Sequence, residues 1–171
     1  MLIPFYIVEP ELAAAETRTI TLFVLHEGVP PGSYGLFEFY CPDPACDCRR
    51  VMLNVAEEKN PNLFLASISY AFDRDDEMAG PFLDPMNPQS EYADGLLRLV
   101  DEMTLSQSSY VARLERHYAM VKQAASNPRH PAYRRLQKVL SDEEIDIPLV
   151  PRSARKPPTR KTRSRRRRRR R

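Results

Sequence analysis

The sequence lacks the motifs by which many hydrolases, kinases and nucleotide-binding enzymes are recognised. It has no Gly-rich phosphate loop, no His-Glu-x-x-His helix motif and no Gly-x-Ser-x-Gly nucleophile turn. Histidine is scarce, with three residues in the chain, and none adjoins a serine or cysteine in a catalytic pattern. These absences favour a non-enzymatic protein and leave catalysis by an open metal site as the weaker alternative.

The N-terminus also lacks the features of a secretory signal. The opening segment, residues 1–6, has no basic stretch and no long apolar run. No membrane span is expected elsewhere in the chain. We therefore expect a cytoplasmic, reducing compartment, where closely spaced cysteines are more often metal ligands or redox thiols than structural disulfides.

Cysteine is as scarce as histidine, but the three cysteines are clustered. The segment reads Cys41-Pro-Asp-Pro-Ala-Cys46-Asp-Cys48 and lies between two strand-like stretches. An odd number of thiols argues against a disulfide framework. Three thiolates this close favour zinc, which prefers sulfur and imposes little geometry of its own. The spacing predicts a zinc site at Cys41, Cys46 and Cys48 that ties down an eight-residue connection.

The cysteines supply three of the four ligands that a structural zinc needs. The candidates for the fourth are His26, Asp43, Asp47, His117 and a water molecule. His26 has the strongest case, because it ends an apolar run and precedes a turn close in sequence to the cluster. Two alternatives to a metal stay open: a redox pair formed by Cys46 and Cys48, and three reduced cysteines without a chemical role.

Two hydrophobic periods divide the first 150 residues into a strand-rich and a helical part. Alternation with a period of two predicts strands over residues 18–25, 34–40, 50–55 and 64–72, joined by short connections as in an antiparallel meander. From residue 90 the period changes to 3.6 and predicts two to three helices. We therefore expect one α+β domain, residues 1–150, in which the cysteine knuckle at 41–48 caps the hairpin of the second and third strands.

The helical stripes also predict helix starts and buried side chains. Ser90, then Ser106 or Ser108, are the predicted caps of the first two helices, and Pro131 opens the third. The predicted buried stripes are Tyr92, Leu96, Leu99, Val100 and Met103; Val111, Leu114, Tyr118 and Val121; and Tyr133, Leu136, Val139 and Leu140. His117 falls at the edge of the second stripe, where packing or a surface hydrogen bond is expected. Residues 10–16 fit a further short helix with proline at its first position.

Acidic residues are missing from the end of the chain, where none follows Asp146. Residues 1–151 hold 13 basic and 23 acidic side chains, a net charge of −10, whereas residues 152–171 hold 13 lysines and arginines and no acid. The tail, residues 151–171, lacks apolar periodicity and is expected to be disordered, because it cannot bury enough surface to offset its ordering entropy.

Arginine matches phosphate geometry, so the tail predicts non-specific nucleic-acid binding that weakens as salt rises. The residues predicted to contact phosphates are Arg163, Arg165, Arg166, Arg167, Arg168, Arg169, Arg170 and Arg171. Three alternatives stay open: the tail lies against its own acidic body, it is a low-complexity extension without a role, or it reflects a misread frame at the end of the gene.

Three stretches carry a resemblance to a known group of proteins: residues 37–41 (Phe-Glu-Phe-Tyr-Cys), residues 46–51 (Cys-Asp-Cys-Arg-Arg-Val) and residues 66–70 (Ala-Ser-Ile-Ser-Tyr). Over roughly residues 1–125 the chain resembles bacterial proteins described as SEC-C-motif-containing, many of which end in a zinc motif like that of the SecA translocase. The resemblance implies zinc at the three cysteines and no established activity. The C-terminal motif itself is replaced here by the arginine run, so any partner contact that it makes in the family is in doubt for this chain.

Together these patterns predict a cytoplasmic, non-enzymatic zinc-binding module that acts as an adaptor for an unknown protein partner. The alternatives are nucleic-acid association through the tail and thiol redox chemistry at Cys46 and Cys48.

Overall fold

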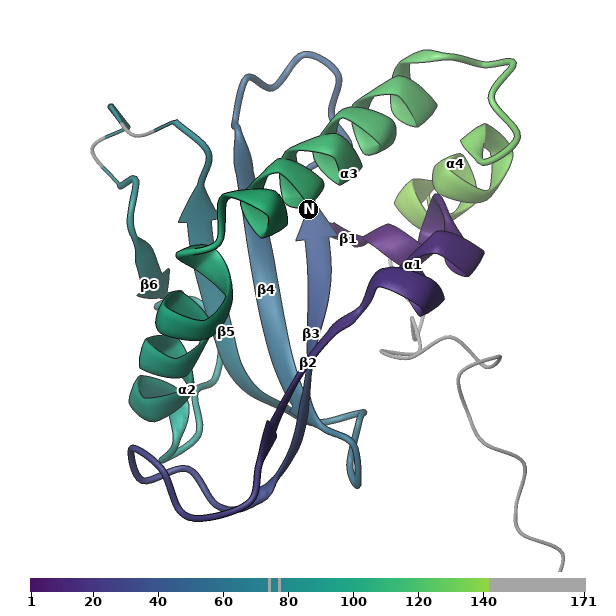
Figure 1. Ribbon diagram of the computed structural model, residues 1–171. Helices are drawn as coiled ribbons and strands as arrows, with labels where there is room; N and C mark the ends of the chain where they lie inside the picture. The colour runs from purple at the N-terminus through teal and green to yellow at the C-terminus, as the bar shows by residue number, and fades with distance from the viewer. Residues whose placement is uncertain (74, 77, 142–171) are drawn as a thin grey trace, which may run out of the picture.

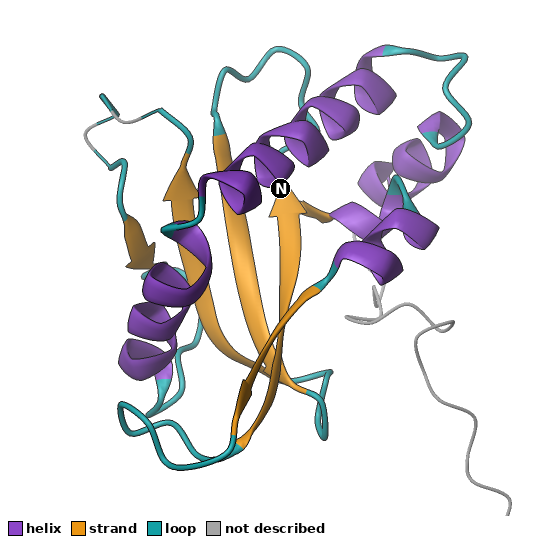
Figure 2. Ribbon diagram, in the orientation of Figure 1, coloured by secondary structure: helices purple, strands orange, loops and turns teal. Residues whose placement is uncertain are grey.

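The computed structural model describes residues 1–73, 75–76 and 78–141. The predicted α+β class is confirmed, since an antiparallel sheet packs against helices (Figures 1 and 2). The predicted tail, with its arginines assigned to nucleic-acid contact, lies outside the described residues, as does the end of the predicted domain from residue 142.

The described chain forms six strands, a short 3-10 helix, four α-helices and one π-helical turn. The strands are β1 (Ile3–Pro4), β2 (Arg18–Leu22), β3 (Gly32–Tyr40), β4 (Arg50–Glu57), β5 (Phe64–Ala71) and β6 (Pro81–Leu83). The helical elements are η1 (Phe5–Ile7), α1 (Pro10–Glu16), α2 (Ala93–Val100), the π-helical η2 (Asp101–Leu105), α3 (Ser108–Ser126) and α4 (Tyr133–Ser141).

The sheet is the predicted meander with one short strand added at each side. Strands β3, β4, β5 and β6 pair in sequence order, and all pairs are antiparallel. Both β1 and β2 pair with the other edge of β3, β1 near its end and β2 near its start. Neither β1 nor β6 was predicted, because two- and three-residue strands are too short to show a period of two.

Strand β2 is shorter than its alternation predicts. Its pairing with β3 ends where Leu22 faces Gly32, which is preceded by two prolines that cannot donate ladder hydrogen bonds. The strand predicted over residues 18–25 therefore ends three residues early, at Leu22. Phe23, Val24 and Leu25 lie in an exposed loop, and Phe23 is 88% exposed.

The predicted helices are present, but a π-helical turn changes the phase of the first stripe. The Ser106 amide donates to the Asp101 carbonyl, five residues earlier, which widens the helix after α2. A period of 3.6 residues consequently no longer predicts the buried positions after Val100, and Met103 is exposed rather than buried. Ser90 binds the Tyr92 amide just before α2, whereas α3 begins without a side-chain cap.

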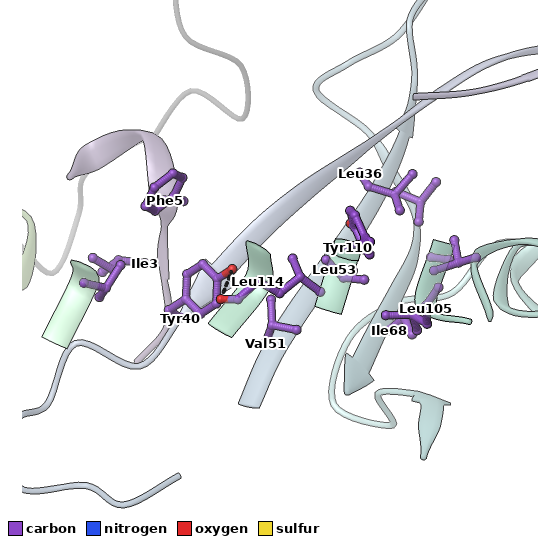
Figure 3. Close-up of a cluster of buried hydrophobic side chains, with 14 of the residues drawn as sticks. Ile3, Phe5, Leu36, Tyr40, Val51, Leu53, Ile68, Leu105, Tyr110 and Leu114 are labelled. Atoms are coloured by element: carbon purple, nitrogen blue, oxygen red, sulfur yellow. Dashed lines mark hydrogen bonds between the residues drawn. The ribbon is translucent and has the colours of Figure 1, made fainter. Parts of the chain in front are cut away.

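The core lies between the sheet and the helices that cross one of its faces. Figure 2 shows α2 and α3 on the same face, and Figure 3 shows core side chains contributed by β3, β4, β5 and α3. Alternate residues of β3 point into this core, among them Leu36 and Tyr40, which are almost fully buried. Helix α4 packs outside α3 and is tied to η1 by hydrogen bonds from Arg135 to the Ile7 and Val8 carbonyls.

Candidate metal centre

The β3–β4 connection contains all three cysteines and is shaped by a turn at Asp43. Cys41 follows the last residue of β3, while Cys46 and Cys48 precede β4. The Asp43 carboxylate accepts a hydrogen bond from the Ala45 amide at 2.9 Å, and the Asp43 carbonyl accepts one from the Cys46 amide at 3.2 Å. This turn reverses the chain and returns Cys46 toward Cys41.

The three thiols lie together, as the sequence predicts. Their sulfur atoms are all within 4.8 Å of one another, and each cysteine is a free thiol of intermediate exposure. In a tetrahedral zinc site with Zn–S bonds of about 2.3 Å, sulfur ligands are roughly 3.8 Å apart. Small side-chain shifts would therefore bring all three sulfurs to bonding distance of one ion. The structure shows three sulfur donors close enough to bind a metal.

The two cysteines nearest β4 have opposite pKa shifts. Hydrogen bonds from Cys48, one of them from its amide to the Cys46 sulfur at 3.5 Å, lower the pKa of the Cys46 thiol. Burial raises the pKa of the Cys48 thiol to about 12, reinforced by its hydrogen bonds with Cys46 and Cys41. The Cys46 thiol therefore loses its proton more readily than the Cys48 thiol, and a cation that binds Cys48 has to displace its proton.

Lys122 of α3 fixes the connection to the helical layer. Its ammonium donates hydrogen bonds to the main-chain carbonyls of Asp43 at 2.6 Å and Cys46 at 2.9 Å. The same ammonium lies 5.3 Å from the centre of the Tyr118 ring. Lys122 thus positions the loop backbone and places a positive charge beside the sulfurs, where it favours thiolates.

His26, the strongest sequence candidate for the fourth ligand, lies at the other end of the sheet. It forms a bridge with Val29 in the turn before β3, whereas the cysteines follow β3 (Figure 1). The nine residues of β3 span eight steps of about 3.3 Å, which places the two ends of the strand roughly 26 Å apart. Proximity in sequence was misleading here, because an extended strand separates neighbouring segments more than any other regular structure.

The other protein candidates do not join the sulfur atoms either. Within the described part of the chain, the metal-ligating group contains the three cysteines and no histidine or carboxylate. His117 is engaged by two glutamates, and the Asp43 carboxylate holds the Ala45 amide. Asp47 is exposed between two of the cysteines. The described residues therefore supply three donors.

A hollow of about 380 Å³ opens beside the cysteines. Cys41 and Cys46 form part of its wall, together with the N-terminus, the knuckle and the helices α3 and α4. The apolar wall residues are Met1, Pro42, Pro44, Ala125 and Leu140, and the polar ones are Asp43 and Gln137. Two of the three cysteines thus border a mainly apolar hollow.

Sequence reasoning missed a second polar group, buried between α1, β3 and α3. We call Glu16, Glu38, Arg113, Arg116 and His117 the ionic cluster. Glu38 is 8% exposed and His117 is 1% exposed, so their charges and polar atoms lie inside the fold. The available signal was Glu38 itself: it occupies a core-facing position of β3, and a carboxylate there requires a partner.

His117 lies between two carboxylates. Its Nδ1 is 2.6 Å from Oε2 of Glu38, and its Nε2 is 3.0 Å from Oε2 of Glu16. The imidazole stacks on the Phe5 ring, with ring centres 4.0 Å apart. An ionised carboxylate only accepts hydrogen bonds, and a neutral imidazole has one N–H. The Arg116 Nη2 atom lies 3.4 Å from the same His117 Nε2 and 2.6 Å from the Glu16 carboxylate, so a donor faces both groups at this end of the ring.

Arginines and a tyrosine complete the ionic cluster. Arg116 lies 2.6 Å from the Glu16 carboxylate, and Arg113 lies 3.9 Å from both Glu16 and Glu38. The Tyr40 hydroxyl donates to Glu38 at 2.8 Å, and burial, followed by the Glu38 charge, raises the pKa of Tyr40. These contacts join α1, β3 and α3, so the cluster orients the helices on the sheet.

Comparison with protein families, curated proteins and solved structures gives no match for this chain. The resemblance to SEC-C-motif-containing proteins therefore stays a prediction. Among the helices of the described residues, none is both long and apolar enough to cross a membrane.

Proposed function

We propose that this protein is a zinc-binding module in which Cys41, Cys46 and Cys48 hold the metal. The observation that supports the proposal is the convergence of three free thiols within 4.8 Å. Zinc suits this donor set, because it prefers thiolates and tolerates distorted geometry. When bound, it supplies a cross-link between the end of β3 and the start of β4. Asp43 shapes the loop and Lys122 anchors it, so the sulfurs are held near one another in advance.

We further infer that the module binds a protein partner rather than catalysing a reaction. The sheet face opposite α2 and α3 presents Phe37, Phe39 and Phe64, which are only partly buried. The Phe39 and Phe64 rings meet edge to face with centres 5.8 Å apart, and the Phe37 and Phe64 ring centres are 6.5 Å apart, so the three rings form one aromatic group. Partly exposed aromatic groups are typical of contact surfaces. The resemblance to SEC-C-motif-containing proteins supports the same role.

Elemental mass spectrometry on the full chain, purified without chelator or a metal-affinity tag, tests the metal. We expect one zinc per chain and protection of all three thiols from alkylation. Cys46→Ser should lose the zinc and leave two reactive thiols. Ser108→Cys, an exposed change at the end of α3 remote from Lys122, adds a thiol away from the knuckle; it is the control and should retain one zinc. Wild-type protein without stoichiometric metal and with three reactive thiols would refute the proposal.

Thiol redox chemistry at Cys46 and Cys48 is the second candidate. The Cys48 amide contacts the Cys46 sulfur at 3.5 Å, and the pKa of Cys46 is lowered, which favours the attacking thiolate. Oxidation to a disulfide would release two protons and two electrons to an added disulfide such as oxidised glutathione. Mass spectrometry after equilibration in glutathione buffers distinguishes the two functions. A reversible loss of two hydrogens in metal-free protein favours redox chemistry, and inertness refutes it.

Nucleic-acid binding through residues 152–171 stays a proposal supported by charge alone. The 13 basic residues of this segment contrast with the net charge of −10 in residues 1–151. Retention of the full chain on immobilised RNA should weaken steeply with salt. The matched control replaces the seven terminal arginines with glutamines and should elute at low salt. Equal retention of both proteins would refute a role for the arginine run.

A further inference from the structure

The chain contains three cysteines and three histidines, and all six lie in the described residues. Each histidine has a place outside the sulfur group. His26 belongs to the turn before β3, and both ring nitrogens of His117 face carboxylates. His130 lies between α3 and α4, and its Nδ1 atom accepts a hydrogen bond from the Ala132 amide at 3.2 Å. No further thiol or imidazole ligand is therefore available from the described fold without rearranging it.

The two aspartates of the knuckle do not complete the site either. The Asp43 carboxylate holds the turn through the Ala45 amide, so turning it toward a metal would break the turn that brings Cys46 back. Asp47 is exposed, and it is not among the groups that meet at the sulfurs. With three donors from the described chain and a preference of zinc for four, one coordination position faces outward.

The outward direction is defined by the hollow beside the cysteines. Its volume of about 380 Å³ lies within the range of sites for small organic molecules, which is roughly 300–1,000 Å³. Cys41 and Cys46 are among the residues that line it, so a metal held by the three cysteines would lie beside it. The wall is mainly apolar, with Met1 and Leu140 among its members, and Gln137 is one of its polar residues.

We propose that this hollow binds a small organic thiol, whose sulfur is the fourth ligand of the metal held by the three cysteines. This inference rests on the proposed zinc site. A sulfur ligand is favoured because zinc bound by three thiolates is a soft acceptor. An apolar wall also accommodates the carbon part of a thiol, whereas an oxygen ligand would lose its hydration there. The Lys122 ammonium partly offsets the negative charge of a fourth thiolate. On binding, a sulfur–metal bond forms, the thiol proton passes to solvent, and no electron is transferred.

Cobalt(II) is the probe, because its absorption reports both the number of thiolate ligands and the coordination geometry. The full chain is first saturated with cobalt(II), with the cysteines reduced by a phosphine, and 2-mercaptoethanol is then titrated. The thiolate-to-cobalt charge-transfer absorbance should rise saturably by about one third, as three thiolates become four. Imidazole, titrated in parallel, should leave that band at its three-thiolate intensity.

Matched variants locate the ligand in the hollow. Gln137→Trp fills the hollow from an exposed position of α4 and should abolish the rise, while Lys138→Trp, an exposed neighbour, should retain it. Four carboxylates follow α4 in the sequence, and the variant with Asp142→Asn, Glu143→Gln, Glu144→Gln and Asp146→Asn tests whether one of them is the fourth ligand instead. This variant should keep both cobalt binding and the thiol-induced rise in absorbance.

The outcomes separate this inference from the zinc proposal. Failure to bind cobalt(II) refutes the zinc site itself. Cobalt binding with no rise on adding thiol leaves the zinc site standing and refutes the external ligand. The external ligand is also overturned by a four-thiolate spectrum before thiol is added, by metal-induced dimerisation, or by equal responses of the two tryptophan variants.

Discussion

The cysteine knuckle and the ionic cluster differ in how their members are brought together. The three cysteines lie within one connection and remain partly exposed. In the ionic cluster, by contrast, His117 is 79 residues from Glu38 and 101 from Glu16, and it is almost fully buried. The knuckle therefore needs a local turn to form, whereas the ionic cluster needs the whole fold. The stability of the knuckle should therefore depend on bound metal, and that of the ionic cluster on the packing of the fold.

The largest effect is expected from breaking the ionic cluster. Glu38→Ala removes a buried carboxylate and leaves His117 and Arg113 without its charge, which should cost about 3–5 kcal/mol in the free energy of unfolding. Urea denaturation of metal-free protein measures this loss. Glu115→Ala removes an exposed glutamate of α3, 3.8 Å from Arg49, and should cost less than about 1 kcal/mol. Similar losses in the two variants would show that the ionic cluster is no more important than a surface ion pair.

The knuckle should contribute stability only when metal is present. With free zinc at about one hundred times its dissociation constant, the wild type gains about 2.7 kcal/mol, which Cys46→Ser should lose. Without metal the two proteins should unfold at nearly the same urea concentration, because the Cys46 thiol is partly exposed. Denaturation with and without a chelator measures both states. An equal gap between wild type and variant in both states would contradict the proposed metal dependence.

Two tyrosines next to the ionic cluster sharpen the comparison between paired and unpaired buried groups. Tyr40 donates to Glu38, and its hydroxyl also lies 3.2 Å from the Leu114 carbonyl (Figure 3), so Tyr40→Phe should cost about 1–3 kcal/mol. Among the described residues, the buried Tyr110 hydroxyl has no hydrogen-bond partner, and Arg113 lies over its ring at 4.6 Å. Tyr110→Phe should therefore be neutral or stabilising. Urea denaturation of both variants tests this, and a larger loss from Tyr110→Phe would contradict the hydrogen-bond assignment.

The anchor of the knuckle should affect metal affinity more than stability. Lys122→Met keeps much of the aliphatic chain and removes both hydrogen bonds to the loop carbonyls. Zinc affinity, measured by competition with a chromophoric chelator, should fall about 10- to 100-fold, as expected when an outer support of a metal site is lost. Gln123→Met, at the adjacent exposed position, is the matched control and should keep wild-type affinity. Unchanged affinity in Lys122→Met would mean that the turn at Asp43 alone positions the sulfurs.

Alkaline pH should produce the most gradual change. Burial raises the pKa of Tyr6 to about 12 and also raises the pKa values of Tyr40 and Tyr110 above the ordinary 10.0. A phenol whose pKa is higher in the folded state contributes stability below its unfolded pKa and loses it as pH rises through the folded one. The free energy of unfolding should therefore decline above about pH 10, and less in Tyr110→Phe. Stability that rises over this range would contradict these pKa directions.

Much of the fold was predictable because it depends on short-range patterns. Period-two alternation located β3, β4 and β5, and period-3.6 stripes identified the buried Leu96, Leu114 and Leu136. The predictions went wrong where a neighbour changed the pattern. The prolines facing β2 ended its ladder, and the π-helical turn shifted the phase of the helix after Val100.

The candidate site was predictable to the same extent. The cysteines could be grouped from spacing alone, because a loop of eight residues cannot separate them far. The position of His26 could not, since it depends on whether the intervening residues extend or fold back. The ionic cluster required pairing choices among distant residues of opposite charge, and one sequence offers many such pairs.

The contacts of Lys122 have a consequence for how freely the knuckle can change. Both of its hydrogen bonds end on main-chain carbonyls, and every amino acid supplies that group. The exposed side chains of Ala45 and Asp47 take no part in the anchor, so they can be replaced while the loop keeps its path. The knuckle thus offers two positions at which fluorescent or affinity labels can be introduced next to the sulfurs without disturbing them.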